Sequence, residues 1–224
     1  MNWKLSNSYQ EDNTMKDKPL NLVGTKILKE LQVEKTVLEV ASSMLEAQKK
    51  VEPLITAGMK SVAGVTGGRL AGLEFRVKSL SSLVRKIETD AKYKDLSFEE
   101  SAVRIVDVLR YTTIFSVDNF GPKFLEMKAR LESLGFITFE VKNTWKDEEA
   151  PYRGVNTKIS YKGLMFEMQY HTEESFDLKN GQLHNLYEEA RDLSTPRERR
   201  QELVKEMIAL SASLESPQGI DQVQ

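Results

Sequence analysis

The chain has 224 residues, of which 40% are hydrophobic and 29% are charged, and its formal net charge is −2. These values are ordinary for a soluble globular protein, and the length suits one medium-sized domain containing helices and strands. The balanced charge gives no whole-chain argument for binding nucleic acid, although local basic patches remain possible. Because the chain has no cysteine, disulfides, thiolate zinc sites and thiol nucleophiles are excluded, whereas cytosol and export both stay open.

The two ends of the chain are polar. Residues 1–20 lack the apolar middle of a signal peptide and predict a flexible arm, and residues 217–224 predict a flexible tail. Residues 21–64 predict an N-terminal helical segment, which Pro53 and the glycine-rich residues 63–68 are expected to break. No run of about 18 apolar residues occurs, so we expect no membrane-spanning helix and no membrane partner.

The stretch from residue 72 to residue 90 changes from strand to helix periodicity. Phe75 and Val77 alternate with two basic residues, which favours a strand. Ser79 can then cap a helix whose apolar residues recur at helical spacing, namely Leu80, Leu83, Val84 and Ile87.

The cations of this stretch follow its polar side. Arg76 and Lys78 point one way from the predicted strand, and Ser82 and Lys86 share one flank of the helix. Free N–H groups at a helix start favour anions, so the segment could bind a polyphosphate. An amphipathic strand and helix with solvated cations is the alternative.

The next elements follow from the same periodicities. They are a helix capped by Ser97 and Glu100, a central strand within 106–115, an amphipathic helix at 118–134 ended by Gly135, and a half-buried strand with Ile137, Phe139 and Val141 inward. Residues 183–193 predict another helix. A C-terminal helix at 194–216 is predicted to have Thr195 as its cap and Pro196 as its first residue.

Residues 155–170 give the clearest hairpin, with Lys162 and Gly163 as its turn. In that register Lys158 opposes Glu167 and Asn156 opposes Gln169, and His171 lies on the same face. A solvated sheet face is the commoner explanation of such residues. However, a carboxylate flanked by an amide and an imidazole suits a functional site.

Helices and strands interleave along the chain, which predicts an α+β fold with a mixed β-sheet of four to five strands flanked by helices. Residues 65–193 form the predicted core. Asp107 lies inside an apolar run of that core, where an unpaired carboxylate is costly. It could form an ion pair with Arg104 or Arg110, or it could share Mg²⁺ with Glu167, since hard divalent ions prefer carboxylate oxygens.

Several motifs occur in order between about residues 70 and 192. The spacing R-x-K-x-x-x-S-[IL]-x-x-K is kept by Arg76, Lys78, Ser82 and Lys86, and an aspartate within a strand-like run follows as Asp107. "PYRGVN" is similar to G-Y-R-[SG]-[IL]-H, "EMQYHT" is similar to E-[IL]-Q-x-R-T, and a later His-x-x-Tyr matches His184 and Tyr187. Together they resemble the synthetase domain of the RelA/SpoT family, the (p)ppGpp or alarmone synthetases, which has a nucleotidyltransferase-like fold.

The resemblance implies a pyrophosphokinase that moves the β,γ-diphosphate of ATP to the 3′-hydroxyl of a purine nucleotide. It assigns Asp107 and Glu167 to catalysis and to Mg²⁺, and Glu167 also to activation of the 3′-hydroxyl. It assigns ATP binding to Arg76, Lys78, Ser82, Arg85 and Lys86. The residues left for the acceptor are Tyr152, which would stack on its base, Arg153, Asn156, Lys158, Gln169, which would support the Glu167 strand, and His171.

The chain departs from the family on the acceptor side. Asn156 stands where the family usually has histidine, His171 where it has arginine, and Thr112 where it often has arginine, with Arg110 nearby. The acceptor therefore stays open among guanine nucleotides, giving ppGpp or pppGpp, adenine nucleotides, giving ppApp or pppApp, and the 3′ end of tRNA.

The resemblance is closer to toxin-type single-domain members, found in phage, prophage and secreted toxins. It implies a growth-inhibiting enzyme acting in the cytoplasm, delivered from another cell or of phage origin, with an immunity or antitoxin protein as partner. Residues 21–60 could dock such a partner or pack against the core. RNA binding could involve the arginines near the last helix, Arg191, Arg197, Arg199 and Arg200, unless nearby glutamates offset them. A non-catalytic binding module is a further alternative. A copy that had lost its activity should also have lost Asp107, Glu167 or the basic stretch, and all of these are present.

Overall fold

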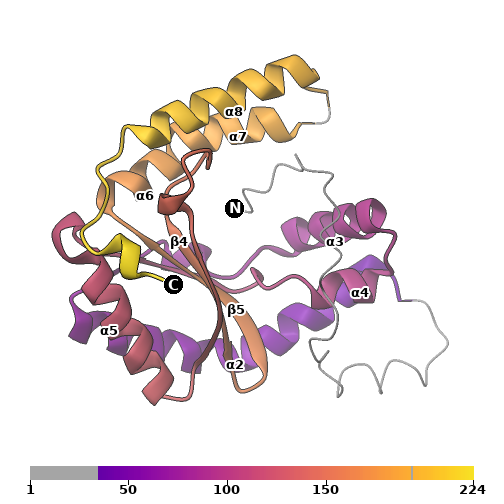
Figure 1. Ribbon diagram of the computed structural model, residues 1–224. Coiled ribbons are helices and arrows are strands. Elements are labelled where there is room, and N and C mark those ends of the chain that lie inside the picture. Colours follow the sequence, from indigo (N-terminus) through magenta and orange to yellow (C-terminus); the bar gives the residue numbers. More distant parts are fainter. Residues whose placement is uncertain (1–34, 193) are drawn as a thin grey trace.

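The computed structural model of the protein describes residues 35–192 and 194–224 (Figure 1). The predicted arm at 1–20 and the first part of the predicted helical segment, residues 21–34, lie outside these ranges. The strands form one five-stranded mixed sheet in the order β1-β2-β5-β4-β3. The neighbours β2 and β5 are parallel and the other pairs are antiparallel. The strands are β1 (Arg69–Ala71), β2 (Arg110–Ile114), β3 (Ile137–Asn143), β4 (Val155–Tyr161) and β5 (Leu164–His171). The α+β prediction is confirmed.

Helices cover the sheet on both faces. Figure 1 shows α2 (Val37–Thr66) and α5 (Phe120–Ser133) on one side, and α6 (Glu173–Asn180), α7 (Gln182–Arg191) and α8 (Arg197–Ala212) on the other. The helices α3 (Leu80–Lys94) and α4 (Phe98–Val103) pack against the N-terminal half of α2. Within the described residues, no helix is both long and apolar enough to cross a membrane.

The β4–β5 hairpin has the predicted register. Lys158 pairs with Glu167 and Asn156 pairs with Gln169. Lys162 and Gly163 have φ angles of 49° and 79°, the left-handed pair that a tight two-residue hairpin turn requires. One face of the hairpin contributes to the main core against α2 and α5, with Val155, Ile159, Phe166, Met168 and Tyr170 buried. The other face is polar and meets α6.

The helix α2 runs for 30 residues straight through Pro53, so the prediction of a break there is wrong. A proline inside a helix loses one hydrogen bond. Burial of the following turns compensates, because Ile55 and Met59 are fully buried in the main core. The helix ends at Gly67, which adopts a left-handed φ of 74°. Of the two roles considered for residues 21–60, the described part therefore packs against the core.

The strand predicted around residues 75–78 is also wrong. Gly72 turns the chain with a φ of 62°, residues Leu73–Phe75 form a short 3₁₀ helix, and Phe75 is 79% exposed. Val77 keeps an isolated bridge to Leu109. The predicted strand at 106–115 is likewise shorter, because pairing with β5 covers only residues 110–114.

The strand β3 lies at an edge of the sheet. The alternation predicted Ile137 and Phe139 to face inward, but both side chains are more than half exposed. The register between β3 and β4 shifts between Thr138 and Glu140, which is a bulge, and bulges re-aim the side chains of edge strands.

The C-terminal residues 217–224 are not the flexible tail that their polarity predicts. Ile220 and Val223 are buried in the main core, and the Asn143 side-chain amide donates hydrogen bonds to both of their carbonyl oxygens, at 2.9 and 3.3 Å. The helix before them begins at Arg197, one residue later than predicted. The Thr195 hydroxyl donates to the Glu189 carbonyl instead of capping the helix.

Candidate active site

A single arginine bridges the two carboxylates that the family resemblance assigns to catalysis. Arg110 begins β2 and lies opposite Glu167 of β5 in the parallel register. Its Nη2 is 2.8 Å from Asp107 Oδ2, and its Nε is 2.5 Å from Glu167 Oε2. Asp107 precedes β2 and is only 5% exposed. Of the two arginines considered as ion-pair partners of Asp107, Arg104 and Arg110, the structure has the pair with Arg110.

Two lysines complete this cation cluster, which consists of Lys78, Lys86 and Arg110 around Asp107. The Lys78 ammonium lies 3.2 Å from Asp107 Oδ2, and the Lys86 ammonium lies 3.1 Å from Oδ1. Lys86 is positioned by α3, whose start Ser79 caps by accepting a hydrogen bond from the Ser82 amide, as predicted.

Electrostatics keep the cluster charged. Burial of Asp107 disfavours its charged form, but the charges of Lys78, Lys86 and Arg110 outweigh this and lower its pKa. Burial opposes the charge of Arg110 as well, yet Glu167 and Asp107 raise its pKa. For Lys78, burial lowers the pKa more than Asp107 raises it. Three cations face two carboxylates, so the cluster has one excess positive charge, which favours an anionic ligand.

Two other residues assigned to ATP lie apart from this cluster. The Arg76 Nε is 2.6 Å from Glu52 Oε1 on α2, whereas Lys78 contacts Asp107. The prediction that Arg76 and Lys78 point the same way is therefore wrong. Arg85 is exposed on a different flank of α3 from Lys86, where it lines a groove of about 670 Å³ with Leu38, Leu80, Ser81, Val84 and Glu88.

The buried Tyr152 and His171 form a hydrogen-bonded chain with the half-buried Asn156. The Tyr152 hydroxyl donates to Asn156 Oδ1 at 3.0 Å and lies 2.8 Å from His171 Nε2. Burial and the charge of Lys179 lower the pKa of His171 well below its usual value, so the imidazole is neutral. The two ring nitrogens of His171 therefore both have hydroxyl partners, Nε2 the Tyr152 hydroxyl and Nδ1 the Ser175 Oγ at 2.9 Å.

These hydrogen bonds hold the ring of Tyr152, on which the resemblance predicts the acceptor base to stack, inside the protein. Tyr152 is 1% exposed, and burial together with the Glu167 charge raises its pKa well above the usual value. A base can stack on Tyr152 only after this segment moves, so the stacking role stays a prediction. Gly154 is required beside it, since a Cβ there would lie 2.4 Å from the Tyr152 hydroxyl oxygen.

Arg153 and Lys158 make contacts away from the carboxylates. Arg153 is buried and donates to the carbonyls of Thr144, at 2.8 Å, and Asp147, which fixes the preceding loop. Lys158 forms an ion pair with Glu140 of β3 at 2.5 Å, and both side chains are more than 40% exposed. Their assignment to the acceptor stays a prediction.

Sequence reasoning missed Lys179. It lies on α6, a helix that was not predicted, and its ammonium is 2.6 Å from Gln169 Oε1. Burial and the charge of Arg110 lower the pKa of Lys179 to about 7, against the opposing effect of Glu167. The available signal was the capping box of α6, in which Thr172 and Ser175 bond each other's backbone.

His184 and Tyr187, which match the later family motif, lie on α7. Tyr187 is 9% exposed and packs in a small core between α7 and α8 with Leu203 and Met207. This gives Tyr187 a structural contact irrespective of any catalytic role.

A magnesium ion would have two protein ligands here. In the part of the chain that the structure describes, no group of three or more histidine or acidic side chains gathers as a metal site. Mg²⁺ is commonly held by one or two carboxylates plus water and substrate phosphates. Asp107 and Glu167, joined through Arg110, fit that donor set for an ion that arrives with a nucleotide.

Two of the four arginines near the last helix form ion pairs with acidic side chains. Arg191 pairs with Glu188 at 3.2 Å, and Arg199 pairs with Glu189 at 2.8 Å and with Glu202 at 3.4 Å. These contacts support the solvated, charge-balanced flank over an RNA-binding surface.

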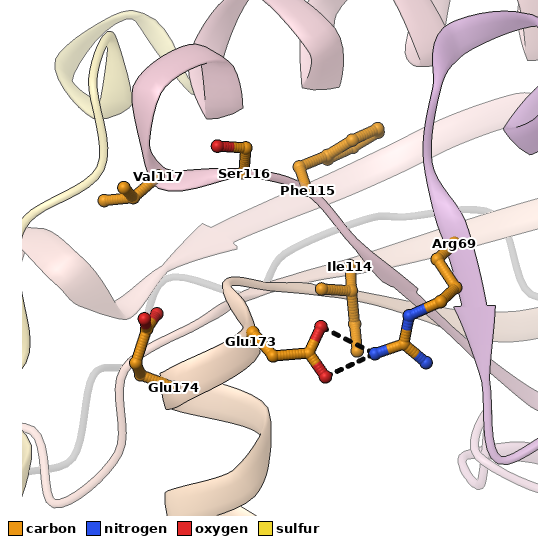
Figure 2. Close-up of a pocket in the computed structure, with 7 residues that line it drawn as sticks. All are labelled: Arg69, Ile114, Phe115, Ser116, Val117, Glu173 and Glu174. Atoms are coloured by element: carbon orange, nitrogen blue, oxygen red, sulfur yellow. Dashed lines mark hydrogen bonds and ion pairs between the residues drawn. The ribbon is translucent and has the colours of Figure 1, made fainter.

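A pocket of about 330 Å³ lies at the end of β2, lined by residues that sequence reasoning did not single out. Figure 2 shows Arg69 of β1 reaching toward Glu173 at the start of α6, with Glu174 directed elsewhere. The Arg69 guanidinium contacts both carboxylate oxygens of Glu173, at 2.5 and 2.6 Å. This ion pair is exposed and lies apart from the predicted site.

No protein-family model and no curated protein matches the chain. Solved structures do match. The small alarmone synthetase 1 from Bacillus subtilis bound to its product pppGpp has a TM-score of 0.51 and 16% identity, over 74% of this chain and 87% of that one. A GTP pyrophosphokinase family protein from Streptococcus pneumoniae has a TM-score of 0.49 and 14% identity, over 75% of this chain and 88% of that one. The likeness to the Bacillus protein confirms the synthetase-type fold that the motifs imply.

Proposed function

We propose that this protein is a nucleotide pyrophosphokinase that transfers the β,γ-diphosphate of ATP to the 3′-hydroxyl of a purine nucleotide. The observation that carries the proposal is the cation cluster of Lys78, Lys86 and Arg110 around Asp107, with Glu167 on the same arginine. Phosphoryl-type transfer depends on cations that hold the phosphates and on a positioned hydroxyl. The fold shared with an alarmone synthetase supports this chemistry.

In the proposed step, the 3′-oxygen of the acceptor attacks the β-phosphorus of ATP. The bond from the β-phosphorus to the oxygen bridging it to the α-phosphorus breaks, and AMP leaves. The hydroxyl proton passes to a carboxylate, and we assign Glu167. Asp107 is a poor proton acceptor because its three cations lower its pKa, whereas Glu167 pairs, among the described residues, with Arg110 alone.

The cations have separate tasks in this proposal. Lys78 and Lys86 bind the phosphates of ATP, and Arg110 stabilises charge that develops on the transferred group. Arg76, Ser82 and Arg85 keep their assignment to ATP from the sequence resemblance. When bound by Asp107 and Glu167, Mg²⁺ would neutralise charge on the β- and γ-phosphate oxygens.

The test is incubation of the protein with labelled ATP and each of GDP, GTP, ADP, AMP and deacylated tRNA, followed by identification of the products. Glu167→Gln should lower transfer by about 10²- to 10⁴-fold while the fold persists. Glu206→Gln, an exposed glutamate on α8, is the matched control and should be fully active. Transfer to none of these acceptors, or full activity of Glu167→Gln, would contradict the proposal.

A growth-inhibiting role in the cytoplasm is part of the proposal, with an immunity or antitoxin protein as partner and delivery from another cell or a phage as its origin. It is supported by the resemblance of the basic stretch and the hairpin to toxin-type synthetases. Induced expression in a bacterial host should arrest growth for the wild type and not for Glu167→Gln. Arrest by both would separate toxicity from the transfer reaction.

A further inference from the structure

Lys179 is a buried ammonium group without a counterion. The residue is 5% exposed, donates to Gln169 Oε1 at 2.6 Å, and lies 5.8 Å from the centre of the Phe176 ring. No carboxylate in residues 35–192 or 194–224 pairs with it. A buried charge that meets only a neutral acceptor is costly, so an anion bound beside Lys179 would stabilise its charged form.

Gln169 presents a second unsatisfied donor beside it. The side chain is fully buried, its Oε1 accepts from Lys179, and its Nε2 has no acceptor among the described residues. The orientation is fixed, because flipping the amide would place its NH₂ group against the ammonium. An orphaned buried donor costs about 1–3 kcal/mol. An amide donor on β5 that lacks an acceptor and an ammonium on α6 that lacks an ion-pair partner among the described residues therefore lie side by side.

The position of these donors relates them to Glu167. Gln169 follows Glu167 by two residues on the same strand face, a spacing of roughly 6–7 Å. Lys179 is close enough to Glu167 and Arg110 for both to influence its pKa. His171 adds no charge here because it is neutral. An acceptor with its 3′-oxygen at Glu167 would thus extend across its ribose toward Gln169 and Lys179.

We propose that Lys179 and Gln169 bind the 5′-phosphate group of the acceptor nucleotide. This inference rests on the proposed pyrophosphokinase function. A phosphate supplies what both side chains lack, since its oxygens accept from the ammonium and from the amide Nε2 in charge-assisted hydrogen bonds. The site selects acceptors that have a 5′-phosphate over nucleosides that lack one.

The test is equilibrium dialysis of guanosine, GMP, GDP, adenosine, AMP and ADP in the presence of α,β-methylene-ATP, whose bridging carbon prevents transfer. Lys179→Met keeps the length of the side chain and removes its charge, and Lys205→Met, at an exposed lysine on α8, is the control. We expect Lys179→Met to weaken binding of the diphosphates at least tenfold and of the nucleosides less than twofold. The affinity of Lys179→Arg for the diphosphates should stay within a few fold of the wild-type affinity, because the positive charge is kept.

A second variant guards against a loss of folding. Gln169→Glu gives Lys179 an internal carboxylate, so the protein should fold and lose diphosphate binding at least tenfold. If the role of Lys179 is only structural, both variants should bind nucleosides and nucleotides more weakly by the same factor. That result, or wild-type diphosphate affinity in both variants, would overturn the inference.

Failure of this inference can be told apart from failure of the proposed function. If the wild type transfers diphosphate and Lys179→Met keeps the wild-type KM for the acceptor, the inference alone is wrong. If the wild type transfers nothing but Lys179→Met still loses nucleotide binding selectively, the phosphate site stands and the proposed reaction is wrong.

Discussion

Replacing Lys86 by methionine removes one of the three cations that surround Asp107. The Lys86 ammonium and the Asp107 carboxylate are 3.1 Å apart, and the two side chains are 18% and 4% exposed. At an effective dielectric constant of about 20, such a pair attracts by about 5 kcal/mol. Desolvation opposes this, and Asp107 keeps Lys78 and Arg110 as partners. We therefore expect Lys86→Met to lower the free energy of unfolding by about 1–2 kcal/mol, less than the ~3–5 kcal/mol for a carboxylate losing its only partner.

The effect of removing Lys86 on stability should change sign when Asp107 is replaced by asparagine. Without the carboxylate, three cations lie together, so Asp107→Asn should lower the free energy of unfolding by about 3–5 kcal/mol. Removing Lys86 from that variant relieves repulsion and should be neutral or stabilising. The double-mutant cycle should give a coupling energy of about 1–3 kcal/mol.

The assay is urea unfolding followed by circular dichroism at pH 7 for the wild type, both single variants and the double variant. Lys92→Met, at an exposed lysine of the same helix, is the control and should show no coupling with Asp107→Asn. A coupling energy below about 0.5 kcal/mol for Lys86 would refute the argument, because distant independent sites add to within that value.

Three further predictions follow from the structure. Because the pKa of Asp107 is lowered in the folded state, its contribution to stability is present above its unfolded pKa of about 4 and is lost as the pH falls below that value. The stability gap between the wild type and Asp107→Asn, measured by urea unfolding, should therefore close below about pH 4, and a constant gap would contradict this. Gly154→Ala brings a Cβ to 2.4 Å from the Tyr152 hydroxyl oxygen and should lower the free energy of unfolding by about 1–3 kcal/mol; an unchanged thermal midpoint would show that the loop yields freely. Deleting residues 218–224 removes two buried core side chains, Ile220 and Val223, and should lower the free energy of unfolding by about 3–6 kcal/mol in urea, whereas deleting Gln224 alone should have no effect.

Local patterns in the sequence were sufficient for the hairpin and for part of the site. The period-two alternation on both sides of Lys162 and Gly163 specifies one register, and that register places Glu167 and Gln169 on one polar face. An aspartate in an apolar run has few ways to be satisfied, so Arg110 could be named among its partners from sequence alone.

Long-range packing decided the features that sequence patterns did not predict. Pro53 stays inside a helix because the residues after it are buried in the main core. Arg76 fits the motif spacing of Lys78, but the turn at Gly72 sends it to Glu52, a residue of another helix. Lys179 was missed because the short helix that holds it has no clear apolar stripe.

The packing of residues 217–223 has a consequence for the order of synthesis. Val223 is buried beside Ile220, and the Asn143 side-chain amide donates to the carbonyl oxygens of both. Nascent chains fold from the N-terminus as they emerge, and a chain that has not reached Ile220 and Val223 lacks two side chains of the main core. A shorter nascent chain would lack their packing, so an activity that depends on a rigid sheet would arise only once translation has passed Val223.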